Sequence, residues 1–127
     1  MKKITLTLFL MLISLFILNN NVHAKSSSNL VNIYFFHSNT CSHCKEESNY
    51  LNKLEKRYKN IKIYKYEVHD QNNHQLLKEL ETLYNIKINS VPLTIIGNKV
   101  YTGYSEKSQI IFIKTIEYFS KYSYEDK

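Results

Sequence analysis

Cysteine and proline are scarce in this sequence, and tryptophan is absent. The 127 residues include two cysteines, one proline and two glycines, and no internal repeat is visible. A structural zinc site usually takes four ligands from two separated clusters, and no second Cys/His pair complements the single Cys-x-x-Cys segment. The scarcity of cysteine therefore concentrates any thiol chemistry in one short stretch of the chain.

Clusters of like charge are also missing. The chain has 17 Lys and Arg against 11 Asp and Glu, which gives a formal net charge of +6. The lysines are spread among acids and tyrosines, whereas a nucleic-acid interface typically shows a basic stripe with aromatic platforms. We interpret the charged residues as a solvated surface with no nucleic-acid partner, leaving only weak attraction to an anionic wall or membrane surface.

The one long uncharged apolar run lies at the N-terminus. Lys2 and Lys3 precede an apolar stretch over residues 4–18, and Val22-His23-Ala24 resembles a signal-peptidase site. This pattern predicts a signal peptide over residues 1–24. The alternative is a retained membrane anchor, although the run is shorter than the ~20 residues that a spanning helix needs. No cysteine lies near the cleavage site, so lipoprotein anchoring is not indicated.

Cleavage after Ala24 would leave a flexible lead-in over residues 25–29 and a single domain over residues 30–127. About 100 residues can bury one modest core, and there is no room for a second domain. We expect a monomer in a secreted or extracytoplasmic location. Disulfides persist in that compartment, whereas cytosolic thiol pools would keep the cysteine pair reduced.

Hydrophobic periodicity predicts two strands and two helices in alternation. Apolar β-branched and aromatic residues favour strands over Val31–Phe36 and Ile61–Val68. Apolar residues at helical spacing predict amphipathic helices over Ser42–Tyr58 and around Leu76–Tyr84. In the second of these helices Leu76, Leu80 and Leu83 recur at i, i+4 and i+7. The segment over residues 37–40 supplies loop and N-cap residue types just before Cys41.

The last part of the chain predicts a hairpin followed by a helix. Pro92 introduces a strand over Leu93–Ile96, Gly97 and Asn98 form a turn, and Lys99–Thr102 returns antiparallel. Ser105 is the candidate N-cap of a helix that ends near Tyr122. The apolar residues that we assign to this helix are Ile110, Phe112, Ile113, Ile116 and Phe119. The element order is β-α-β-α-β-β-α.

The two cysteines form Cys41-Ser42-His43-Cys44, directly before the first predicted helix. A disulfide closing so small a loop would stabilise the fold by only about 2 kcal/mol, so reversible exchange explains the spacing better than a structural role. Unpaired N–H groups and the helix dipole stabilise a thiolate, which favours Cys41 as the attacking sulfur. Cys44, one turn further, is expected to be more buried and to act as the resolving thiol.

Charged neighbours can tune the Cys41 thiolate. His43 lies between the two cysteines, where an imidazolium or ring N–H would stabilise it further. Lys45 would help slightly, while Glu46 and Glu47 in the same turn oppose it. The alternative for His43 is an exposed helix residue without a tuning effect.

With Cys-x-x-Cys at the first strand-to-helix junction and Val-Pro ahead of a hairpin, the chain resembles the thioredoxin superfamily. The matching segments are Phe36–Lys45, Val68–Asn72, Tyr84–Ile96 and Gly103. The resemblance implies an α/β fold, a three-layer α/β/α sandwich around a mixed four-stranded sheet. It also implies a thiol-disulfide oxidoreductase that exchanges the Cys41/Cys44 dithiol-disulfide with protein thiols and disulfides through a mixed disulfide, without a cofactor.

The resemblance assigns further roles near the only proline. It implies that Pro92 is cis and lies against the cysteine pair, so that Val91 and Pro92 form part of the substrate platform; an ordinary trans proline is the alternative. His43 and Val91 resemble the secreted disulfide-oxidase branch more than the cytosolic reductases. The direction of exchange stays open, and we expect a membrane or extracytoplasmic redox partner to regenerate the active form.

Two positions depart from the family pattern. Thr40 stands where a tryptophan often precedes the first cysteine, and Phe35 stands where a buried strand acid often aids proton transfer. Any internal base for Cys44 must therefore come from elsewhere in the chain or act through water.

Two rival functions remain from the sequence. A metal-binding module could use Cys41, His43 and Cys44, with His37 as a further ligand, for zinc or cuprous copper. A non-catalytic thioredoxin-like adaptor could keep the pair as a small local disulfide. Turnover of a protein disulfide distinguishes an enzyme from both.

Overall fold

The computed structural model describes residues 28–126, so the predicted signal peptide and residues 25–27 of the lead-in lie outside the described residues. The elements are β1 (Val31–His37), α2 (Ser42–Arg57), β2 (Ile61–Glu67), the short 3-10 helix η1 (Gln71–Asn73), α3 (His74–Tyr84), β3 (Leu93–Ile96), β4 (Lys99–Thr102) and α4 (Glu106–Lys121). None of the helices within this part of the chain is long and apolar enough to cross a membrane.

The four strands form one mixed sheet in the order β2-β1-β3-β4. β1 runs parallel to β2, with Val31 opposite Ile61, and antiparallel to β3, with Phe36 opposite Leu93. β3 and β4 form the predicted hairpin. Gly97 supplies the positive φ of 59° that its two-residue turn requires. This order places the end of β1 beside the start of β3, where the cysteine segment and Pro92 meet.

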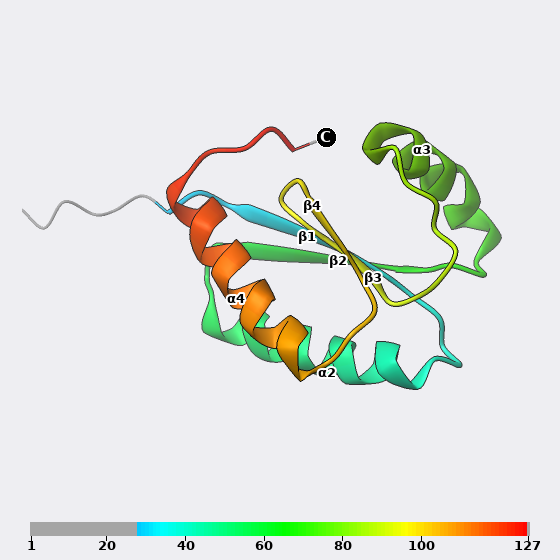
Figure 1. Ribbon diagram of the computed structural model, residues 1–127, viewed down its shortest axis with the longest axis horizontal. Coiled ribbons are helices and arrows are strands. Elements are labelled where there is room, and N and C mark those ends of the chain that lie inside the picture. The colour runs from blue at the N-terminus through cyan, green and yellow to red at the C-terminus, as the bar shows by residue number, and fades with distance from the viewer. Residues whose placement is uncertain (1–27, 127) are drawn as a thin grey trace, which may run out of the picture.

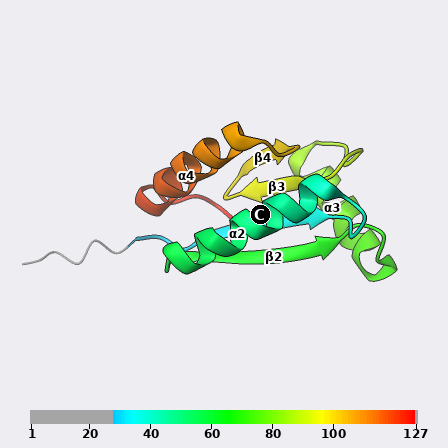
Figure 2. The ribbon, with the colours of Figure 1, turned by 90° about the horizontal axis from the view of Figure 1, so that it is seen from below.

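Helices cover both faces of the sheet, as the two ribbon views show (Figures 1 and 2). α2 and α4 pack on one face of the sheet, against the odd-numbered side chains of β1. The core on this face includes Val31, Ile33 and Phe35 from β1, Leu51 and Leu54 from α2, and Phe112, Ile116 and Phe119 from α4. α3 packs on the other face through Leu80, against Phe36, Leu93 and Ile95. The architecture is the three-layer sandwich that the sequence predicts.

The C-terminal segment completes the second face beyond the end of α3. The hydroxyl of Tyr124 accepts the backbone N–H of Asn32 at 2.8 Å, and Asp126 accepts the hydroxyl of Tyr34 at 2.9 Å. At the opposite end of the described chain, the Asn29 N–H donates to the Ser120 carbonyl at 3.0 Å. Both ends of the domain are therefore fastened through hydrogen bonds.

Two apolar residues on the predicted helical faces lie in solvent. Ile110 in α4 is 60% exposed and Leu83 in α3 is 46% exposed. Neither side chain joins the buried residues of its helix, which are Leu80 in α3 and Phe112, Ile116 and Phe119 in α4. The helices are predicted correctly, but the assignment of these two residues to the apolar face is wrong.

Candidate redox site

The cysteine segment begins where β1 ends. Ser38 is buried, its hydroxyl lies 3.0 Å from that of Thr40, and its carbonyl accepts the Cys41 N–H at 3.1 Å. This tight turn directs the chain from the sheet into α2 and leaves Cys41 as the N-cap of the helix. The predicted helix start is confirmed. Thr40 is exposed and holds the turn rather than covering the sulfurs.

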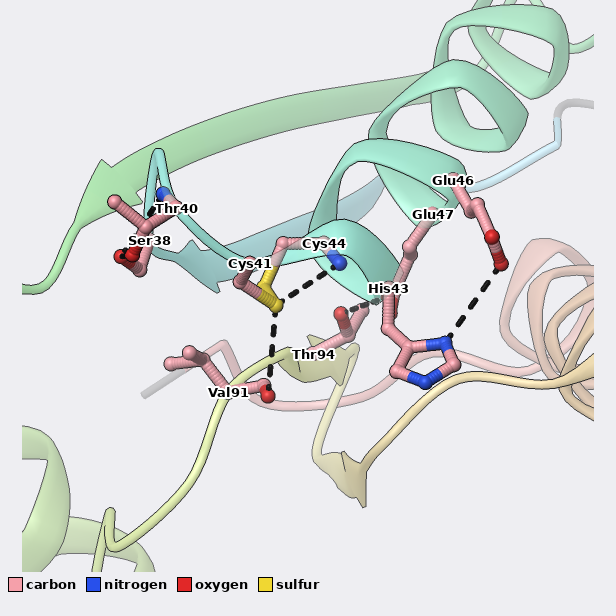
Figure 3. The surroundings of a disulfide bond; sticks show 9 residues. All are labelled: Ser38, Thr40, Cys41, His43, Cys44, Glu46, Glu47, Val91 and Thr94. Atoms are coloured by element: carbon pink, nitrogen blue, oxygen red, sulfur yellow. Dashed lines mark hydrogen bonds and ion pairs between the residues drawn. A yellow bond between two sulfur atoms is a disulfide. The ribbon is translucent and has the colours of Figure 1, made fainter.

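Cys41 and Cys44 form a disulfide, with their Cα atoms 5.2 Å apart. The Cys44 N–H points at Cys41 Sγ over 3.1 Å, which is the capping hydrogen bond of α2 (Figure 3). Cys41 is partly exposed, whereas Cys44 is 2% exposed. Once the pair is reduced, the same N–H and the dipole of the 16-residue helix favour a thiolate at Cys41.

The segment before β3 lies directly against Cys41. The Val91 carbonyl oxygen is 3.8 Å from Cys41 Sγ, and the Val91–Pro92 peptide bond is cis, as the resemblance implies (Figure 3). The Pro92 carbonyl accepts the Gly103 N–H at 2.8 Å, which holds this segment to the end of the hairpin. Residues about fifty positions apart in sequence therefore meet at one sulfur atom.

His43 lies in solvent on the first turn of α2. Its Nδ1 is 3.7 Å from Glu46 Oε2, and both side chains are about two-thirds exposed. In Figure 3 the imidazole extends away from the sulfur atoms toward Glu46. In this arrangement the ring interacts with a carboxylate on its own helix and with solvent. Its tuning role is still a prediction.

A buried carboxyl was missed by the sequence analysis. Glu47 is 1% exposed, and its Oε1 accepts the Thr94 hydroxyl from β3. Burial raises the pKa of Glu47 to about 7, and the Thr94 hydrogen bond acts in the opposite direction. The sequence grouped Glu47 with Glu46 as a charge opposing the Cys41 thiolate and did not identify it as a core residue. The available signal was helical spacing, because Cys44, Glu47, Leu51 and Leu54 are the buried residues of α2.

A small hollow of about 210 Å³ lies beside the disulfide, lined in part by His37, Cys41, Cys44 and Lys45. The His37 ring stacks on the buried Phe35 with centroids 5.2 Å apart. Burial lowers the pKa of His37, Lys65 lowers it further, and Glu67 opposes them. Across residues 28–126 no three His, Cys, Asp or Glu side chains converge as a metal ion requires.

Solved structures share the overall arrangement. Thioredoxin f from spinach chloroplast is 21% identical with a TM-score of 0.54, covering 78% of this chain and 89% of that one. Oxidised thioredoxin O2 from Arabidopsis thaliana is 17% identical with a TM-score of 0.54, covering 76% and 83%. Oxidised mitochondrial thioredoxin 3 from Saccharomyces cerevisiae is 19% identical with a TM-score of 0.51, covering 72% and 81%.

No protein-family model and no curated protein matches the sequence. Identities near 20% establish the fold and nothing finer. The mixed four-stranded sheet with helices on both faces matches these structures at the level of the fold. The chain therefore has the fold of the thioredoxin superfamily.

Proposed function

We propose that this chain is an exported thiol-disulfide oxidoreductase that exchanges the Cys41/Cys44 dithiol-disulfide with protein substrates. One observation carries the proposal: the disulfide lies at the N-cap of α2, with its outer sulfur beside Val91. A structural disulfide needs neither a helix terminus nor an open face, whereas reactive cysteines typically lie at partly exposed sites that stabilise a thiolate, such as a helix N-terminus. The neighbouring thioredoxin structures support the same reading at the level of the fold.

Unequal exposure of the two sulfurs sets the order of the steps. Cys41 is accessible and next to a helix N-terminus, so its thiolate attacks one sulfur of a client disulfide. A Cys41–client bond forms, the client S–S bond breaks, and the second client sulfur leaves as a thiolate that takes up a proton. Cys44 then loses its proton and attacks Cys41 Sγ, which releases the first client sulfur as a thiolate. Two electrons pass to the client, and oxidation of a client dithiol is the reverse.

Val91 and Pro92 supply a backbone platform for the client. The Val91 carbonyl is 3.8 Å from Cys41 Sγ, so an extended segment bonded to that sulfur lies within reach of the Val91 backbone. Main-chain pairing there would hold the client without reading its side chains. This fits exchange with several protein disulfides rather than with one.

Export is the second part of the proposal. It rests on the two lysines, the apolar run and the Val22-His23-Ala24 site at the N-terminus. A monomer outside the cytosol would need an extracytoplasmic or membrane redox partner to restore its working state. Processing at Ala24 is tested by N-terminal sequencing of the protein recovered from its producing cell, where an intact N-terminus contradicts a cleaved signal.

The exchange activity is tested by trapping. Cys44→Ser, mixed in its reduced form with insulin whose disulfides are intact, should accumulate mixed disulfides through Cys41, because the resolving thiol is gone. Cys41→Ser should accumulate few. Non-reducing gels and mass spectrometry identify the bond. Equal trapping by both variants contradicts the roles, and no insulin turnover by the wild type favours an adaptor. A thiol-form metal stoichiometry near one per chain favours a metal module.

A further inference from the structure

Glu47 is a buried carboxyl that the exchange steps above do not use. It is 1% exposed, its Oε1 is bonded to the Thr94 hydroxyl, and its Oε2 has no hydrogen-bond partner within residues 28–126. Neither ion pair of the described residues includes it. A carboxyl without a cation in a protein core is destabilising when ionised, and such a group is a candidate for a functional role.

The position of Glu47 provides that use. Cys44 and Glu47 lie three residues apart on α2, which puts them on one face of the helix one turn apart. Both are buried on the sheet-facing side, and Figure 3 shows Glu47 meeting Thr94 beneath the first turn of α2. Thr94 itself follows Pro92 by two residues in β3. The carboxyl is thus held between the resolving cysteine and the strand that continues from the client platform.

Cys44 needs a proton acceptor during resolution. Its thiol must become a thiolate before it can attack Cys41 Sγ, and a side chain that is 2% exposed has little access to bulk water. A carboxyl whose pKa is raised to about 7 is a stronger base than an ordinary glutamate and stays partly ionised at neutral pH.

We propose that Glu47 is the proton acceptor for Cys44 in the resolving step, with Thr94 as its positioning residue. The proton passes from Cys44 Sγ to Glu47 Oε2, directly or through one water. The Cys44–Cys41 bond forms, the Cys41–client bond breaks, and the client sulfur leaves as a thiolate that is protonated by solvent. Glu47 then returns its proton to water. This inference rests on the proposed exchange function and names the base for its second half.

The other titratable groups around Glu47 do not replace it. Tyr104, from the segment before α4, is neutral at pH 7, since burial raises its pKa and the Glu47 charge adds to the rise. His37, at the end of β1, lines the hollow beside the disulfide and is the competing base among the residues that line it. It is partly exposed, however, and burial lowers its pKa, which makes it a weaker base. Glu46 points into solvent toward His43.

The test separates the two halves of exchange by stopped-flow. Full-length reduced protein is mixed with excess insulin disulfide, and formation and decay of the Cys41 mixed disulfide are followed by acid quenching. Glu47→Gln should form the mixed disulfide at the wild-type rate but resolve it about tenfold or more slowly, without the wild-type rise in rate near pH 7. Thr94→Val should keep that rise but displace it to higher pH, because the Thr94 hydrogen bond lowers the pKa of Glu47 and its loss lets that pKa rise.

Control variants distinguish a failure of the Glu47 assignment from a failure of the exchange function. Glu55→Gln, an exposed acid on the same helix, should match the wild type. If Glu47→Gln resolves normally, or if His37→Gln alone abolishes the pH-dependent rise, the assignment is overturned while the exchange function stands. If the wild type forms no mixed disulfide, the exchange function itself fails. In wild-type protein, ¹³C NMR should show the Glu47 carboxyl titrating differently in the oxidised and reduced states; identical curves overturn the proposal without any variant.

Discussion

Replacing Glu47 by glutamine should change how the stability of the oxidised protein depends on pH. In the unfolded chain this carboxyl titrates near 4.5, whereas burial raises its pKa to about 7 in the fold. Between these values the folded state binds more protons than the unfolded state, so stability falls as pH rises. At 1.36 kcal/mol per pKa unit the loss is about 3 kcal/mol, complete above the folded pKa and absent below the unfolded pKa.

The assay is urea unfolding of the disulfide forms of the wild type and Glu47→Gln at about pH 5 and about pH 8. The unfolding midpoints are converted to free energies with one m-value for both proteins. The disulfide removes thiol titration from this range. His37 contributes in the opposite sense, because its lowered pKa makes stability rise with pH, but it is present in both proteins and cancels.

Glutamine keeps an oxygen for the Thr94 hydroxyl but adds N–H donors that the site does not satisfy, at a cost of about 1–3 kcal/mol. The comparison therefore uses the difference between the two pH values rather than absolute stability. The wild type should lose about 2–3 kcal/mol more than Glu47→Gln over this interval, because part of the full loss has already occurred at about pH 5. Parallel losses in the two proteins would refute the claim that the buried carboxyl carries the raised pKa.

Two further predictions concern the hairpin turn and the cysteine pair. Gly97→Ala should destabilise the fold by about 2–4 kcal/mol in urea unfolding, because φ is +59° and the new Cβ would lie 2.6 Å from Phe119 Cδ2. Gly103→Ala, at φ +77° with no atom within 4 Å, should cost only about 1–2 kcal/mol, so equal losses would contradict the Phe119 clash. His43→Ala should make the pair more reducing in a titration against glutathione, since it removes a group that favours the thiolate. An unchanged potential would mean that the exposed imidazole interacts with Glu46 alone.

Local pattern was enough to predict the elements of this fold. Each predicted strand or helix is present with bounds shifted by at most a few residues, and the hairpin strands agree at both ends. Periodicity works here because the apolar stripe of a helix or strand is encoded within the element itself. The position of Cys41 at the start of this helix was predicted in the same way, from turn-forming residues followed by an amphipathic run, although the N-cap is Cys41 itself and not one of residues 37–40.

The error at Glu47 shows where local pattern stops. Next to Lys45 and Glu46 it looks like one more charge on a solvated turn, and only the packing of α2 against β3 makes it a core residue. The same limit applies to Ile110, whose helix offers a wider apolar stripe than the sheet can cover. Exposure depends on what lies opposite, and that partner comes from a distant part of the sequence.

The sequence by itself determined the order of elements, the placement of both sulfurs at a helix start and the turn residues between them, because these depend on neighbours along the chain. Tertiary structure alone decided that Val91 lies against Cys41 and that Thr94 meets a carboxyl beneath the first helical turn. Those contacts join segments about fifty residues apart, and they exist only after the sheet has brought β1 and β3 together.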